Sequence, residues 1–241
     1  MKTRSTPTRR QAASVGAADA SKGSGRVYAS ALMQDRRLRI LEETRRAIEE
    51  GGIENLSVRE LCKRADIAQR TLYNAFGSKD RVVGLAIRDH YLAQIARMKF
   101  STPEDSIEGV IERIVRVSLR ATRQKNYLKA ILDVHFSSEP HPDIVSVTRE
   151  IAVGNVMPWL TRLQAMGQLN SHLPVDEVAG HMAELVLLTM RRWTVGEITG
   201  TTMRERVVRG FLTLAVGATV GRAQASALAL LAAHGSGQRA D

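Results

Sequence analysis

The segment that decides the fold runs Leu56-Ser-Val-Arg-Glu-Leu-Cys-Lys-Arg-Ala-Asp-Ile-Ala-Gln-Arg-Thr-Leu-Tyr-Asn-Ala-Phe76. A helix-turn-helix crosses two short helices at a steep angle, so it needs small residues at the crossing, apolar residues on both helices and a tight turn. Leu61 and Ala65 supply the inward face of the first helix, and Cys62 is the small residue at the crossing. Asp66 takes the turn, because aspartate tolerates the left-handed conformation better than most residues. The segment therefore predicts a helix-turn-helix.

The boundaries of both helices can be predicted from local signals. Ser57 followed by Glu60 is a capping box, in which the hydroxyl accepts from the amide three residues on and the carboxylate reaches back. This predicts a first helix over 58–65 and a second over 69–76. The apolar side chains that complete the plug between them are Ile67, Leu72 and Phe76.

A third helix is expected just before this segment, over about 35–50, and ends at Gly51-Gly52. Its apolar stripe recurs with a period near 3.6 residues. The stripe consists of Leu38, Ile40, Leu41, Thr44, Ala47 and Ile48.

The free face of the 69–76 helix carries side chains that can read DNA. Glutamine pairs with adenine, arginine pairs with guanine, and threonine offers a methyl group to thymine. Tyr73 and Lys79 are of types that bind DNA phosphates. Ser57 and Arg59, at the amide end of the first helix, can bind the flanking DNA backbone. The alternative is an ordinary solvated face. The candidate DNA-binding residues are Ser57, Arg59, Gln69, Arg70, Thr71, Tyr73, Asn74 and Lys79.

Residues 35–85 resemble the TetR family of bacterial transcriptional regulators. The resemblance lies in Ser57-Val-Arg-Glu-Leu61, in 65–68 and in Thr71-Leu-Tyr-Asn-Ala-Phe-Gly-Ser-Lys-Asp80. It implies DNA contacts from Arg59, Gln69, Arg70, Thr71, Tyr73 and Lys79. Two positions depart from the family pattern, Asp66 where glycine is customary and Ala75 where a larger aromatic residue or histidine often sits.

The resemblance also implies an all-α fold, in which a three-helix head is joined by a linking helix over about 79–100 to a larger helical body for ligand binding and dimerisation. We accordingly expect a basic disordered tail at 1–33, a DNA-binding domain at 34–82, an effector-binding and dimerisation domain at 83–235 and a flexible end at 236–241. The tail is either a solvated extension or an arm that makes minor contacts with DNA phosphates.

Charge is distributed as this division requires. The 241 residues have a net charge of +10. The excess of basic residues is five in 1–34 and four in 35–100, but only one in 101–241. A basic N-terminal end favours binding to a polyanion. A nearly neutral body is consistent with binding of an apolar ligand and with a subunit interface.

The body pattern is helical throughout, with no run of period two long enough for a strand. Pro158 should kink the helix that carries the stripe from Ile144 to Leu163. Helices at about 175–198 and 203–233, the latter one helix or two, are the expected dimer interface. An apolar pocket is expected among Met98, Tyr127, His135, Phe136, Trp159, His181, Met182 and Trp193.

The function expected is that of a ligand-responsive repressor in the bacterial cytoplasm, associated with the nucleoid. It binds a near-palindromic operator as a homodimer and is released by a small apolar or amphipathic effector, without cofactor, metal or membrane. It is not expected to be an enzyme.

The alternatives are a helical metal-dependent enzyme and a basic membrane-surface protein. The hypothesis of a metal site depends on five side chains that lack the His-Glu-x-x-His spacing, Asp133, His135, Glu139, His141 and Asp143. The pair His181 and Glu184 is more typical of an ordinary helix face.

The single cysteine, Cys62, excludes an intramolecular disulfide and a four-cysteine zinc module, and its inward position favours packing over catalysis. Residues 1–32 lack the apolar run of a signal peptide, and no stretch reaches the length of a transmembrane span.

Overall fold

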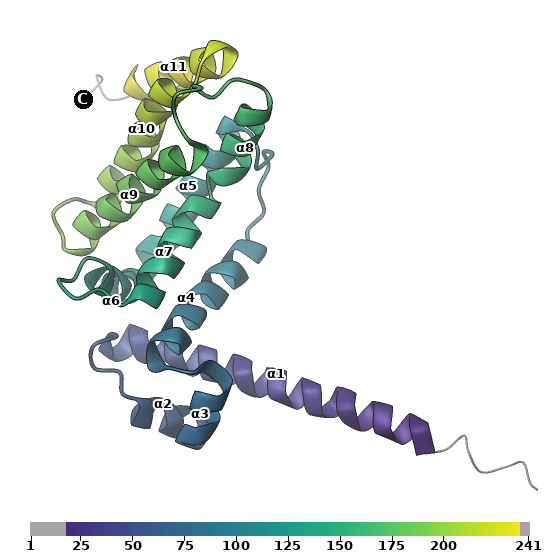
Figure 1. The fold of residues 1–241 in the computed structure, drawn as a ribbon. Coiled ribbons are helices and arrows are strands. Elements are labelled where there is room, and N and C mark those ends of the chain that lie inside the picture. Colours follow the sequence, from purple (N-terminus) through teal and green to yellow (C-terminus); the bar gives the residue numbers. More distant parts are fainter. Residues whose placement is uncertain (1–17, 237–241) are drawn as a thin grey trace, which may run out of the picture. The chain divides into compact units, whose positions relative to one another are not determined.

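A computed structural model describes the backbone of residues 18–236 and the side chains of residues 32–234 (Figure 1). It divides into two units, one ending at Arg39 and one beginning at Ile40. The fold is all-helical, as predicted.

Helix α1 spans Ala18–Gly51 and passes from the first unit into the second. It begins well before the predicted start near Asp35, so residues 18–33, expected in the disordered tail, are helical, whereas 1–17 lie outside the described residues. Leu38, assigned to the apolar stripe, is 54% exposed. Among the described side chains of α1, those of 32–39 are exposed and the first buried one is Ile40, and a helical segment without a buried stripe escapes a search for hydrophobic periodicity.

Helices α2 (Val58–Ala65) and α3 (Gln69–Phe76) form the helix-turn-helix at the predicted boundaries. Ser57 Oγ accepts the amide of Glu60 at 3.1 Å, but the Glu60 carboxylate pairs with Arg64 at 2.9 Å, so only half of the capping box forms in the structure. Asp66 adopts φ 51° and ψ 58°, the left-handed turn that was predicted. Cys62 is buried, and burial raises the pKa of its thiol, as expected for a packing residue.

Helix α4 spans Lys79–Ala96 and is shorter than the predicted 79–100. Its buried side chains belong to the same apolar cluster as those of α1, α2 and α3, here called the head cluster. The head cluster continues into two later helices, α6 (Lys125–His135) and α7 (Pro142–Gly154), through Tyr127, Ile131, Val134 and Ile144. Gly84 permits the close approach of α4 to α7, because a β-carbon there would lie 3.3 Å from the carbonyl oxygen of Asp143.

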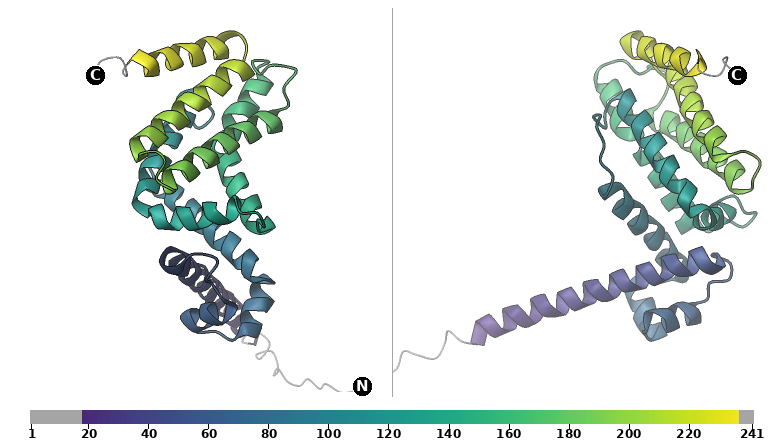
Figure 2. Two further views of the ribbon diagram at one scale, coloured as in Figure 1. Left: turned by 90° about the vertical axis from the view of Figure 1, so that its left-hand side faces the viewer. Right: turned by 180° about the vertical axis from the view of Figure 1, so that it is seen from behind.

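The remaining helices build a second apolar cluster. They are α5 (Ile107–Ala121), the short 3₁₀ turn η1 (Thr122–Gln124), α8 (Met157–Ala165), α9 (Val175–Thr194), α10 (Gly200–Ala218) and α11 (Gly221–Ser236). Helices α9 and α10 run side by side in both views of Figure 2. Gly210 allows this contact, because a β-carbon there would lie 2.6 Å from Leu185 Cδ2.

The helix that Pro158 was predicted to kink is instead broken into two helices. Helix α7 ends at Gly154 and α8 starts at Met157, which places Pro158 in the first turn of α8. There the missing amide costs nothing, because the first amides of a helix have no partner within it.

The stretch 203–233, expected to form one helix or two, is divided into α10 and α11. Val220 N–H donates to the carbonyl of Gln168 at 2.9 Å, and Asn170 N–H donates to that of Ala218 at 2.8 Å. These bonds form an isolated β-bridge between Leu169 and Thr219, and Gly221 follows at φ +61°. The turn therefore depends on a distant connecting segment, which a local pattern does not reveal. No helix within the described residues is both long and apolar enough to cross a membrane.

Candidate nucleic-acid interface and internal cavity

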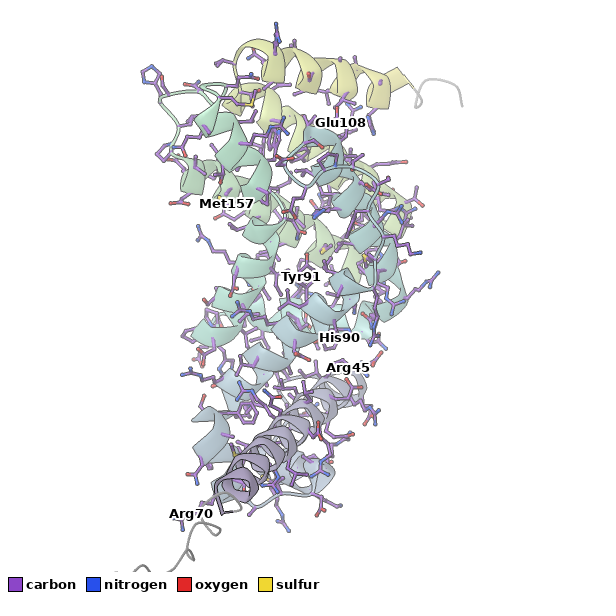
Figure 3. The ribbon with its side chains drawn as sticks, turned by 90° about the vertical axis from the view of Figure 1, so that its right-hand side faces the viewer. Arg45, Arg70, His90, Tyr91, Glu108 and Met157 are labelled. Atoms are coloured by element: carbon purple, nitrogen blue, oxygen red, sulfur yellow. The ribbon has the colours of Figure 1, made fainter. Side chains whose placement is uncertain are left out.

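The outer face of α3 presents polar side chains away from the head cluster. Gln69, Arg70, Tyr73 and Asn74 are exposed, and Thr71 is half-buried. Leu72 and Phe76, on the opposite face, are buried. Figure 3 shows Arg70 at the outer end of the head. The face that could enter a DNA groove is thus separated from the face that holds the helix in place.

Three further candidate residues flank this helix. Ser57 and Arg59 are exposed at the start of α2, and Lys79 is half-buried at the start of α4. Ser57 Oγ already accepts the Glu60 amide, which leaves its proton free to donate to a phosphate. The structure therefore brings the candidate DNA-binding residues onto the three helices that follow α1.

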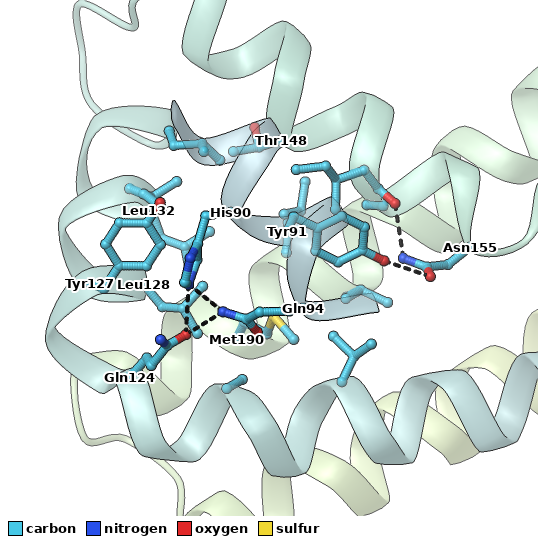
Figure 4. Close-up of a pocket in the computed structure, with 18 residues that line it drawn as sticks. His90, Tyr91, Gln94, Gln124, Tyr127, Leu128, Leu132, Thr148, Asn155 and Met190 are labelled. Atoms are coloured by element: carbon cyan, nitrogen blue, oxygen red, sulfur yellow. Dashed lines mark hydrogen bonds between the residues drawn. The ribbon is translucent and has the colours of Figure 1, made fainter. Parts of the chain in front are cut away.

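The body contains a partly open cavity of about 130 Å³. It lies between α4, α5, α6, α7 and α9, and its lining is predominantly apolar (Figure 4). Cavities of roughly this size hold a benzene-sized molecule. Ile87, Tyr127 and Ile131 belong both to this lining and to the head cluster, so a molecule in the cavity would touch side chains that pack the head.

Polar groups in the cavity form two hydrogen-bonded sets. Gln94 Nε2 donates to Gln124 Oε1 at 2.8 Å, and His90 contacts both glutamines. Tyr91 donates to Asn155 Oδ1 at 2.8 Å (Figure 4). Burial lowers the pKa of His90, so its ring is neutral at pH 7. Sequence reasoning missed these residues, although the four-residue spacing of His90 and Gln94 places them on one face of a helix.

The pocket residues expected from sequence are dispersed. Of the set, only Tyr127 lines the cavity. Met182 lines a smaller cavity beside it, while His135, Phe136 and His181 border an open groove against α9 and α10. Trp159 and Trp193 are packed in the body core, where Trp159 contacts Phe211 edge to face, and Met98 lies beyond the end of α4. Large aromatic residues fill a core as readily as they line a pocket, which explains the dispersal.

The five metal-ligand candidates do not converge in the structure. Asp133 pairs with Lys129 and Arg191, His135 contacts Thr148, and His141 lies 3.3 Å from Asp80. Within the described residues, no three side chains of ligand type are grouped to hold an ion.

The head matches the model of the tetR family of bacterial regulatory proteins over residues 40–84, the stretch that contains α2, α3 and the capped turn. This match supports the TetR family for the chain. The chain is a helix-turn-helix DNA-binding regulator.

Curated relatives of this regulator include the HTH-type transcriptional repressor KstR of Rhodococcus jostii, 26% identical over 158 residues that cover 54% of this chain and 74% of KstR. KstR of Mycolicibacterium smegmatis is 23% identical over 175 residues, covering 60% and 86%. A TetR-family regulator from Rhodococcus sp. shares the fold at a TM-score of 0.57 and 19% identity, covering 75% of this chain and 98% of that one. FadR of Thermus thermophilus, a repressor solved with lauroyl-CoA, has a TM-score of 0.54 and 16% identity, covering 73% and 93%.

Proposed function

We propose that this TetR-family regulator is a cytoplasmic repressor that binds a near-palindromic operator as a homodimer and releases it when a small effector enters the body cavity. The observation that carries the proposal is the cavity itself, whose lining shares side chains with the head cluster. The KstR repressors support repression as the outcome.

In this proposal α3 enters the major groove. Gln69, Arg70 and Thr71, in its first turn, contact base edges. Asn74 lies further along α3. The DNA phosphates on either side are contacted by Tyr73 of α3, by Ser57 and Arg59 at the start of α2, and by Lys79 at the start of α4. These roles are supported by the exposure of the polar face of α3, which points away from the head cluster.

Pairing of two chains follows from what one helix can read. A single recognition helix covers few base pairs, and two-fold pairing places a second copy about 34–36 Å away, one helical turn along the duplex. The open groove along α9 and α10 supports a subunit interface there, because it carries Leu188, which is 54% exposed, next to Leu185 and Leu214. It lies within the ranges 175–198 and 203–233 expected for dimerisation.

The effector acts by linkage. It weakens operator binding only by as much as it prefers the conformer that does not bind DNA, typically about 1–3 kcal/mol. The FadR structure with lauroyl-CoA supports a small-molecule effector for a protein of this fold. A compound that saturates the cavity and leaves operator affinity unchanged is not the effector.

Arg70→Ala is expected to cost about 1–3 kcal/mol of binding at one base position and to relax the preference there. The measurement is binding of the variant to an operator series with every single-base substitution. Arg222→Ala, which removes another exposed arginine, from α11, is the charge-matched control. A loss of equal size on all sequences would reassign Arg70 to phosphate.

Lys79→Ala is expected to weaken binding on every sequence and to reduce the slope of log affinity against log salt by about one unit, because one phosphate contact is lost. A salt titration of operator and non-specific duplex measures both quantities. Lys99→Ala, beyond the end of α4, is the matched control. An unchanged slope contradicts the phosphate role.

A further inference from the structure

Tyr127, which lines the cavity, has a buried hydroxyl without a hydrogen-bond partner in the described part of the chain. The residue is 3% exposed, its side chain lines the cavity, and no described group makes a hydrogen bond to its oxygen. A buried hydroxyl without a partner is destabilising, so such groups are rare in folded proteins and call for an explanation.

The other polar side chains of the lining are already engaged. His90, Gln94 and Gln124 contact one another, Tyr91 bonds Asn155, and Thr148 donates to the carbonyl of Ile144 at 2.9 Å (Figure 4). The charged groups that act on Tyr127 through space are engaged as well, since Arg45 pairs with Glu42 and Glu49 at 3.1 and 2.7 Å. Of the described polar side chains in the lining, Tyr127 alone makes no hydrogen bond.

The cavity also constrains the charge of its occupant. None of the described side chains that line it carries a formal charge, and His90 is neutral at pH 7. An ionised group would lose its hydration there without gaining a counter-charge, which is strongly unfavourable. Arg113 borders not this cavity but an adjoining one of about 40 Å³, and its Nη2 pairs with Glu104 at 2.8 Å.

We propose that the effector places an uncharged group in this cavity, about the size of one six-membered ring, with an oxygen that accepts a hydrogen bond from Tyr127 Oη. The inference rests on the proposed function, because it takes the cavity as the effector site. Burial raises the pKa of Tyr127, which keeps the hydroxyl protonated as a donor. Because the same ring packs in the head cluster, the bond joins the effector to a side chain that holds the head.

The experiment uses three six-membered probes on the full-length protein. Cyclohexanone offers a carbonyl oxygen, methylenecyclohexane replaces that oxygen by a methylene group of similar shape, and cyclohexanecarboxylate is an anion. Binding is followed through the chemical shift of the Met190 methyl group, because Met190 lines the cavity. Tyr127→Phe removes the hydroxyl and retains the ring. Tyr91→Phe is the matched control, since its hydroxyl already has Asn155 as a partner.

We expect cyclohexanone and methylenecyclohexane to bind and the carboxylate not to bind. The affinity of cyclohexanone relative to methylenecyclohexane should fall about three- to tenfold in Tyr127→Phe, the effect of one hydrogen bond, and stay unchanged in Tyr91→Phe. If both neutral probes bind and that ratio is the same in Tyr127→Phe, the inference is overturned while the effector cavity stands. Tighter binding of the carboxylate than of cyclohexanone overturns the uncharged class. If no probe perturbs Met190, both the inference and the proposed effector cavity fail.

Discussion

Leu72→Ala is expected to lower the free energy of unfolding by about 2–5 kcal/mol, the usual cost of truncating a fully buried leucine. Leu72 is 0% exposed and lies in the head cluster with Leu61 and Phe76. Its loss leaves a cavity behind the recognition helix, where the neighbouring helices relax only in part. We expect operator binding to fall with it, because α3 is held to the head by this face. Urea denaturation followed by circular dichroism, together with operator titration, measures both effects.

The matched control is Leu92→Ala, which makes the same chemical change at a leucine of α4 that is 54% exposed. Its unfolding free energy should stay within about 0.5 kcal/mol of the parent protein. Equal losses in the two variants would contradict the packing assigned to Leu72.

Gly109→Ala is the second large effect, with an expected loss of about 2–4 kcal/mol from overpacking and a broken helix cap. A β-carbon at Gly109 would lie far inside van der Waals contact with the carbonyl oxygen of Pro103. That oxygen is held by Ser106, whose amide and hydroxyl donate to it at 3.2 and 2.8 Å, while Ser106 Oγ caps α5 by accepting the Gly109 amide at 3.0 Å. The whole turn must shift to make room.

Thermal and urea unfolding measure the loss. Gly154→Ala, at the end of α7, is the control because nothing lies within 4 Å of a β-carbon there. Alanine favours a helix over glycine by up to about 1 kcal/mol, so this variant should be neutral or slightly stabilised. A stabilised Gly109→Ala would show that the turn before α5 is not fixed as described.

The head was predictable because its signals are local. Ser57, Asp66 and the apolar residues of 58–76 act within one or two helical turns, and the structure follows them in both helix boundaries and the turn. The start of α1 was missed, because a helix with exposed side chains from Leu32 to Arg39 leaves no apolar stripe to detect.

The cavity was not predictable in the same way. Tyr127 was anticipated, but His90 and Gln94 come from α4, Gln124 from η1 and Asn155 from the end of α7, and each alone resembles a polar residue on a solvated helix face. Their common surroundings arise from tertiary packing. The same limitation applies to the α10–α11 turn, which is fixed by hydrogen bonds to the segment around Leu169.

The central claim is that α3 of a paired protein reads DNA sequence. Selection of bound duplexes from a random pool by the purified full-length protein at moderate salt tests it most directly, because sequence, symmetry and spacing are obtained together. We predict a near-palindrome whose half-sites lie about one helical turn apart, 10–10.5 base pairs. Recovery of duplexes with no shared sequence would contradict the account.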